Sequence, residues 1–268
     1  MAAGMEKANS DRRWRSVNRH LCLKRVGLYS LFALGGLLLC VILFRSTLQP
    51  ENCFAGESRE ATLAPAALTA STKESLETHW PASSQLVVVR NDGSLPHIST
   101  LRAFEKKNGT WIPVFVPVRA TTGRNGFAAA GGKREGDGKT PSGIYSLGLV
   151  FGYPSSVTSA MPYRRMTRQD IWVDDPASPD YNRLKKKEET KARSFEDMVL
   201  QDNRYKYGIV VEYNTNPVVP GRGSAIFIHI WKDKNTATAG CVALSEQNIL
   251  RLIRWLDPAR KPLIVLEN

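Results

Sequence analysis

A cysteine and a histidine near the C-terminus are the residues in this sequence best suited to covalent chemistry. Cys241 directly follows Gly240, and His229 lies twelve residues before the cysteine, at the end of an apolar run. A histidine that removes a thiol proton yields a strongly nucleophilic sulfur, which attacks carbonyl carbon. The pair therefore indicates thiolate catalysis. The alternative is a buried structural thiol beside a core histidine, because free cysteine packs as a small hydrophobe.

The N-terminal part of the chain predicts attachment to a membrane. Residues 1–25 carry seven Lys and Arg against two acidic residues, and residues 26–44 contain no charge. Roughly 20 apolar residues span a bilayer as a helix, so the uncharged segment is just long enough. The positive flank places residues 1–25 in the cytoplasm and the rest of the chain outside it. We expect a single-pass protein of the bacterial inner membrane with its body in the periplasm; a cleaved signal peptide is the alternative.

The distribution of cysteines supports the catalytic interpretation. The chain has four cysteines, and three of them, Cys22, Cys40 and Cys53, lie in the tail, the apolar segment and the stretch that follows it. Cys241 is alone in the body, which excludes a disulfide framework there. A lone thiol in an oxidising compartment is a liability unless it is buried or used.

The composition of the chain predicts a tether followed by one folded body. Residues 45–84 are rich in Ala, Ser, Thr, Pro and Glu, and they indicate a flexible tether with a helical turn or two near residues 71–78. Residues 85–268 are long enough for one domain with a sizeable core. Short β-type runs bounded by turn residues predict a mainly β body, with strands within residues 85–90, 101–105, 111–116, 143–147, 207–213, 225–230 and 262–266.

Two further stretches of the body differ from this pattern. A helix is expected after Ser245, which can cap it, because apolar residues recur at helical spacing before Pro258: Ile249, Leu252, Ile253 and Leu256. Residues 155–206 are too long for an ordinary connection between strands, and such stretches often form lids or binding elements. The alternative for them is a solvated surface excursion with a helix around residues 195–201.

Three motifs together resemble the L,D-transpeptidase catalytic domain of the YkuD type. They are the Gly-Asp-Gly-Lys-Thr-Pro-Ser-Gly segment at residues 136–143, His229, and Thr-Ala-Gly-Cys-Val at residues 238–242. The resemblance covers roughly residues 86–266, with residues 155–206 as an insertion. It implies a β-sandwich-like domain in which Cys241 is the acyl-enzyme nucleophile and His229 is the base.

The sequence departs from the family pattern at two positions beside the cysteine. That pattern is commonly Ser/Thr-His-Gly-Cys-Val/Ile-Arg, and this chain has Ala239 for the histidine and Ala243 for the arginine. The changes remove a polar group near the sulfur and a fixed charge for a substrate carboxylate. Gly240 lets the backbone approach closely, so that N–H groups near Cys241 can hold an oxyanion. Thr238 either lines the pocket or only caps a turn.

The resemblance implies action on peptidoglycan stem peptides. Cys241 would form an acyl-enzyme, release a terminal D-amino acid and transfer the acyl group to an amine. Hydrolysis of the same thioester and a catalytically silent wall-binding module are the alternatives. No cofactor is expected, and no metal either, because His20, His79 and His97 have no ligand-like spacing to one another or to His229. The net charge of +12 would suit nucleic acid, but export argues against that partner and favours a carboxylate-rich wall polymer.

Overall fold

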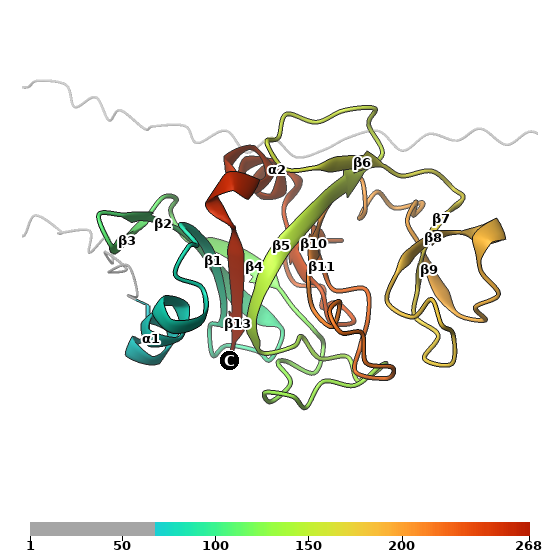
Figure 1. Ribbon diagram of the computed structural model, residues 1–268, viewed down its shortest axis with the longest axis horizontal. Coiled ribbons are helices and arrows are strands. Elements are labelled where there is room, and N and C mark those ends of the chain that lie inside the picture. Colours follow the sequence, from blue (N-terminus) through green and yellow to red (C-terminus); the bar gives the residue numbers. More distant parts are fainter. Residues whose placement is uncertain (1–67) are drawn as a thin grey trace, which may run out of the picture. The chain divides into compact units, whose positions relative to one another are not determined.

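The computed structural model describes residues 68–268 (Figure 1). Within that part of the chain the elements follow in this order: α1 (Ala70–His79), β1 (Gln85–Asn91), β2 (Ile98–Lys107), β3 (Thr110–Pro113), β4 (Val118–Thr121), β5 (Gly143–Gly152), β6 (Tyr163–Arg165), β7 (Asp170–Val173), β8 (Leu184–Lys186), β9 (Phe195–Asp197), β10 (Tyr207–Val211), β11 (Phe227–Ile230), β12 (Val242–Leu244), α2 (Glu246–Trp255) and β13 (Leu263–Glu267). The expected mainly β fold with few helices is confirmed.

The main sheet closes on itself instead of forming two separate layers. Its strand order is β1-β13-β5-β10-β11-β12-β4-β2, and β1 also pairs with β2. β1 is parallel to β13 and antiparallel to β2, so it joins the two ends of the path. β3 and β6 extend the sheet from β2 and β5. The β-sandwich-like domain implied by the resemblance therefore takes the form of one closed sheet around the core.

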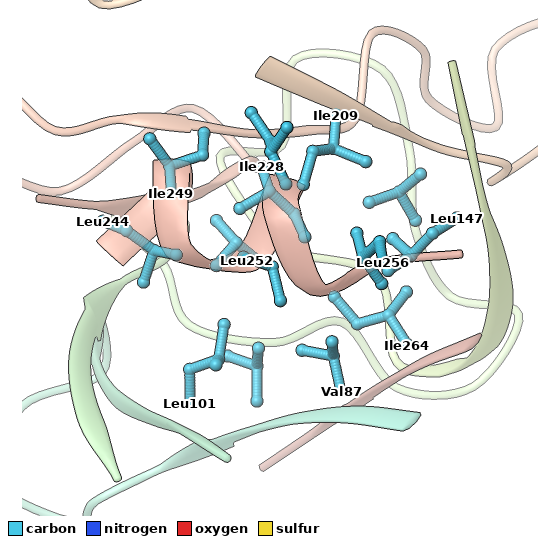
Figure 2. Packing of buried hydrophobic residues seen from close by; sticks show 14 of the residues in the cluster. Val87, Leu101, Leu147, Ile209, Ile228, Leu244, Ile249, Leu252, Leu256 and Ile264 are labelled. Carbon is cyan, nitrogen blue, oxygen red and sulfur yellow. The ribbon is translucent and has the colours of Figure 1, made fainter. Parts of the chain in front are cut away.

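Alternation along β1 divides the apolar side chains of this strand between two clusters. Val87 and Val89 of β1 belong to the interior cluster, whereas Leu86 and Val88 belong to a cluster on the other face. This follows from the two-residue period of a strand. Helix α2 packs inside the curved sheet, and Figure 2 shows its Leu252 among the side chains of strand residues.

Helix α2 matches its prediction from the sequence. The side chain of Ser245 accepts a hydrogen bond from the Asn248 N–H at 3.2 Å, which satisfies a free donor of the first turn. Ile249, Leu252 and Ile253 are buried on one face of the helix. The helix directly follows β12, the strand that begins next to Cys241, so its packing in the core helps to fix the position of that strand.

The folded body begins before Gln85. Residues up to Ser84 were expected to belong to the tether, but Thr69 caps helix α1 through Thr72, and Leu76 is 1% exposed. Leu76 packs with apolar residues of β1 and β13. Weak hydrophobic periodicity concealed this packing, because a single buried leucine anchors the helix. Residues 1–67, with the expected cytoplasmic tail, membrane helix and most of the tether, lie outside the described residues.

No helix within residues 68–268 is long and apolar enough to cross a membrane. The segment expected to do so, residues 26–44, precedes this part of the chain.

The stretch 155–206 forms a small sheet that packs on the body. Its order is β8-β7-β9, and Figure 1 shows these strands grouped to one side of the main sheet. Trp172 and Met198 share an apolar cluster with Phe227 of β11. The helix considered around residues 195–201 is wrong, because β9 occupies Phe195–Asp197. The stretch is therefore a packed subdomain, and a merely solvated excursion is excluded.

An internal ion cluster fixes the small sheet. Asp170 at the start of β7 is 1% exposed and accepts from Arg164 at 2.8 Å and Lys186 at 3.0 Å. Burial raises the pKa of Asp170, but hydrogen bonds from Thr167 and Lys186 outweigh it and hold the pKa at about 2. A carboxylate held in this way ties β6, β7 and β8 together.

Candidate active site

Cys241 and His229 lie on one face of two adjacent strands. β11 and β12 are parallel neighbours, with His229 in register with Ala243. Ile228 and Ile230 belong to the interior core, so the side chain of His229 lies on the opposite face. Cys241 comes two residues before Ala243 and shares that face. Both side chains line one cavity of about 300 Å³.

The Lys-Thr-Pro segment packs directly against the turn that carries the cysteine. A Cβ on Gly240 would lie 2.9 Å from the carbonyl oxygen of Lys139, and one on Gly123 would lie 2.5 Å from that of Gly138. The Gly123 N–H donates to Oγ1 of Thr140 at 2.9 Å. Glycine is needed at both positions because backbone approaches backbone there.

Asp137 organises the loop that precedes this segment. Its Oδ1 accepts from Lys133 Nζ at 2.7 Å and from the Lys139 N–H at 2.8 Å. Its Oδ2 accepts from the Arg134 N–H at 2.8 Å. Burial raises the pKa of Asp137, but these hydrogen bonds outweigh it and hold the pKa below its usual value. Asp137 therefore fixes the loop from which Lys133 and Gly136 line the cavity.

Thr238 both lines the cavity and shapes the turn. Its hydroxyl donates to the Cys241 carbonyl at 2.7 Å and accepts from the Gly240 N–H at 3.1 Å. Because the Gly240 N–H donates to Thr238, the Cys241 N–H is the backbone donor of this turn that lies next to the sulfur. Lining the pocket and capping the turn, the two roles considered for Thr238, therefore occur together.

The thiol of Cys241 is held by backbone groups of the preceding strand segment. Its Sγ donates to the Ala225 carbonyl at 3.2 Å and accepts from the Phe227 N–H at 3.4 Å. The residue is 7% exposed. Burial raises the pKa of the thiol to about 12, and the charge of Glu196 acts in the same direction. In this state the cysteine is a protonated thiol.

The imidazole of His229 is held as a single tautomer. Nδ1 lies 2.8 Å from the Ile230 carbonyl, which can only accept, so Nδ1 carries the proton and Nε2 is the basic nitrogen. Burial lowers the pKa of His229 to about 4, against the opposing effect of the Ile230 hydrogen bond. The ring of Tyr205 packs edge-on against the imidazole, with 5.2 Å between centroids. The histidine is thus neutral and fixed in orientation.

The inserted subdomain contributes side chains that the sequence did not single out. Asp174, Glu196, Arg204 and Tyr205 line the same cavity as Cys241. The Tyr205 hydroxyl donates to Oε1 of Glu196 at 2.6 Å. Burial raises the pKa of Glu196, in opposition to that hydrogen bond. Their only sequence signal is membership of the long stretch expected to form a lid or binding element.

A third carboxylate, that of Glu135, belongs to the same cavity wall. Oε2 of Glu135 accepts from the Ser224 hydroxyl at 2.7 Å and from the Tyr181 hydroxyl. Tyr181 belongs to the inserted subdomain, and Ser224 precedes β11. Glu135 therefore links the motif loop, the insertion and the strand that carries the histidine.

The comparison with known families agrees with this geometry. The family of the YkuD L,D-transpeptidase catalytic domain matches residues 84–265, and the chain belongs to that family. Among curated proteins, none matches the chain.

Two solved structures are similar to part of the chain. One is the crystal structure of the helical cell shape determining protein Pgp2 from Campylobacter jejuni, at 16% sequence identity and a TM-score of 0.35, covering 69% of this chain and 47% of that one. The other is a point mutant of Pgp2, with the same identity and coverage and a TM-score of 0.36. The chain thus spans about half the length of these structures.

Proposed function

We propose that this protein is a peptidoglycan L,D-transpeptidase in which Cys241 is the nucleophile and His229 the general base. One observation carries the proposal. The thiol and an imidazole whose Nε2 is basic lie on the same face of paired strands and line one cavity. Membership of the YkuD family supports the substrate class, a stem peptide that ends in a D-amino acid.

The acylation step follows from these positions. The thiol proton moves to Nε2 of His229 while Sγ attacks the carbonyl carbon that precedes the terminal D-amino acid. The sulfur–carbon bond forms, the carbon–nitrogen bond breaks, and His229 delivers the proton to the leaving amine. The Cys241 N–H stabilises the oxyanion, and a donor of this kind contributes roughly 3–4 kcal/mol to the barrier reduction.

The two pKa values indicate when the proton moves. A thiol with a pKa of about 12 and an imidazole with a pKa of about 4 disfavour a thiolate–imidazolium pair in this buried cavity. Proton transfer therefore accompanies attack, after the thiol leaves the Ala225 carbonyl for Nε2. A substrate carbonyl in the cavity supplies the electrophile that makes this transfer favourable.

The second step resolves the thioester. An amine of another stem peptide attacks the acyl carbon, and His229 removes the proton that this amine loses. The test is incubation of the protein with a tetrapeptide donor, with and without an acceptor stem peptide, followed by mass spectrometry of the products. A cross-linked product supports transfer. Release of tripeptide alone, in the presence of acceptor, would instead identify a hydrolase acting on the same bond.

We also propose that residues 26–44 anchor the protein in the bacterial inner membrane with the catalytic domain in the periplasm. The support is the uncharged run and its basic flank at residues 1–25. A reporter fused after Asn268 should be active only outside the cytoplasm. Activity of a cytoplasmic reporter at the same position would overturn both the topology and the substrate class.

A further inference from the structure

Four cationic side chains line the cavity that contains Cys241, and they differ in availability. Lys133 is buried and committed to Asp137 at 2.7 Å. The side chain of Arg124 lies over the backbone of Gly138, where its Nε is 2.9 Å from the position of an added Cβ. Lys232 is exposed on the segment after β11. The fourth cation, Arg204, comes from the inserted subdomain.

The backbone of Arg204 is fixed beside the histidine. The Ile230 N–H donates to the Arg204 carbonyl at 3.0 Å, and Ile230 directly follows His229. Burial is the dominant influence on the pKa of both His229 and Cys241, and the charge of Arg204 also acts on both. The guanidinium is therefore within electrostatic reach of the two reacting groups.

The guanidinium of Arg204 has further hydrogen-bond donors besides the one that its pairing with Asp202 uses. Its Nε pairs with Asp202 at 2.6 Å, and both side chains are partly exposed, at 41% and 44%. This bond fixes the side chain through one edge and leaves the two terminal nitrogens to serve a ligand. Paired guanidinium donors match the two oxygens of a carboxylate.

The strand position next to the histidine provides no charge of its own. Ala243 is in register with His229, lines the cavity and is 1% exposed. The cation that acts on both Cys241 and His229 is thus Arg204 of the insertion, and β12 supplies none at this position.

We infer that Arg204 binds the terminal carboxylate of the donor stem peptide, which makes the inserted subdomain a specificity element of the active site. This inference rests on the proposed function. A donor that places its scissile carbonyl at Sγ of Cys241 has its terminal carboxylate one residue further on, within the same cavity. Arg204 joins that end of the cavity to β11 and selects donors that end in a free acid.

The test compares two donors that differ only at the terminus, a tetrapeptide ending in D-alanine and its C-terminal amide. Intact-protein mass spectrometry measures the rate of acylation at Cys241. The wild type should prefer the acid by tenfold or more in kcat/KM. Arg204→Gln should lose that preference because the acid becomes slower and the amide does not, and Arg204→Lys should keep part of it.

Arg193→Gln is the matched control, because Arg193 is exposed in the same insertion and does not line the cavity. It removes the same charge and should retain the preference for the acid. Equal melting temperatures would show that the variants fold alike, as expected for a partly exposed side chain whose backbone bond is unaltered.

Three outcomes would overturn the inference. A wild type that acylates with acid and amide equally well would exclude a carboxylate site while leaving the proposed function intact. Retention of the preference in Arg204→Gln, with its loss in Arg124→Gln, would assign the carboxylate to Arg124. Absence of acylation by either donor would refute the proposed function, and the inference would fall with it.

Discussion

The thiol of Cys241 donates its hydrogen bond to the carbonyl oxygen of Ala225, 3.2 Å away, and not to His229. Ala225 has a φ of 52°, in the left-handed region that residues with a side chain rarely adopt. Strained backbone of this kind persists where the surrounding structure fixes it, often at active sites. Cys241 is therefore held as a buried, protonated thiol.

The rate of alkylation of Cys241 in the free protein should show that its thiol is protonated. Because burial raises the pKa of Cys241 to about 12, the rate of iodoacetamide modification should rise by about tenfold per pH unit from pH 7 to pH 10. Peptide mapping by mass spectrometry isolates Cys241 from the other cysteines. A plateau near pH 8.5 would indicate an ordinary thiol and contradict the raised pKa.

Stability should depend on pH through His229. Its pKa is about 4 in the folded protein and about 6.5 when unfolded, so between these values the unfolded chain binds the extra proton. The contribution of His229 to the free energy of unfolding should therefore be complete above pH 6.5. It should decrease as the pH falls towards 4, by about 1.4 kcal/mol per pH unit.

Urea unfolding of the wild type and of His229→Gln between pH 5 and pH 7 measures this contribution. The difference in unfolding free energy between the two proteins should shrink as pH falls, because only the wild type loses stability through this group. A constant difference across the range would mean that the histidine is not held neutral by burial.

Tyr205→Phe should destabilise the inserted subdomain, to which both Tyr205 and its partner Glu196 belong. The change leaves Oε1 of Glu196 without its 2.6 Å donor, and an unsatisfied buried acceptor costs about 1–3 kcal/mol. Tyr207→Phe is the control, because it removes a hydroxyl from a half-buried ring of the core and not one bonded to Glu196. Equal costs of the two substitutions in urea unfolding would show that the bond to Glu196 adds nothing.

Leu76→Ala should destabilise the body by about 2–5 kcal/mol, the usual cost of such a truncation in a core. Leu76 is 1% exposed and packs with residues of β1 and β13. Thermal unfolding of a fragment starting at Leu68 measures the effect, and a fragment starting at Gln85 should be destabilised similarly. Unchanged melting temperatures would restore the interpretation of residues 68–84 as a tether.

The sequence predicted the elements whose pattern is local. The helix after Ser245 was predicted because its cap and apolar stripe lie within one segment, and the body's long strands carry β-branched runs between turns. β4 and β12 are four and three residues long, and their strand character comes from pairing with distant partners. β9 was considered as part of a helix for the same reason: its pairing with β7 is tertiary.

The residues of the candidate site also divide into those that the sequence predicts and those that only tertiary packing brings to the cavity. Cys241 and His229 stand out because their chemistry is recognisable from residue type and spacing. Glu196, Arg204 and Tyr205 are ordinary residues in a long stretch, and only the docking of that stretch brings them to the cavity. The neutral state of the thiol and imidazole also depends on tertiary burial, which no local pattern contains.

The most direct test of the account is acylation of Cys241 by a tetrapeptide donor, followed by intact-protein mass spectrometry from pH 6 to pH 10. The wild type should gain the mass of the donor less D-alanine. Cys241→Ser should gain nothing, because a serine hydroxyl is far too basic to be activated in the same cavity. His229→Ala should be acylated slowly, at a rate that increases with pH as thiolate forms without a base. Normal acylation of Cys241→Ser, or wild-type behaviour of His229→Ala at neutral pH, would contradict the assignment of nucleophile and base.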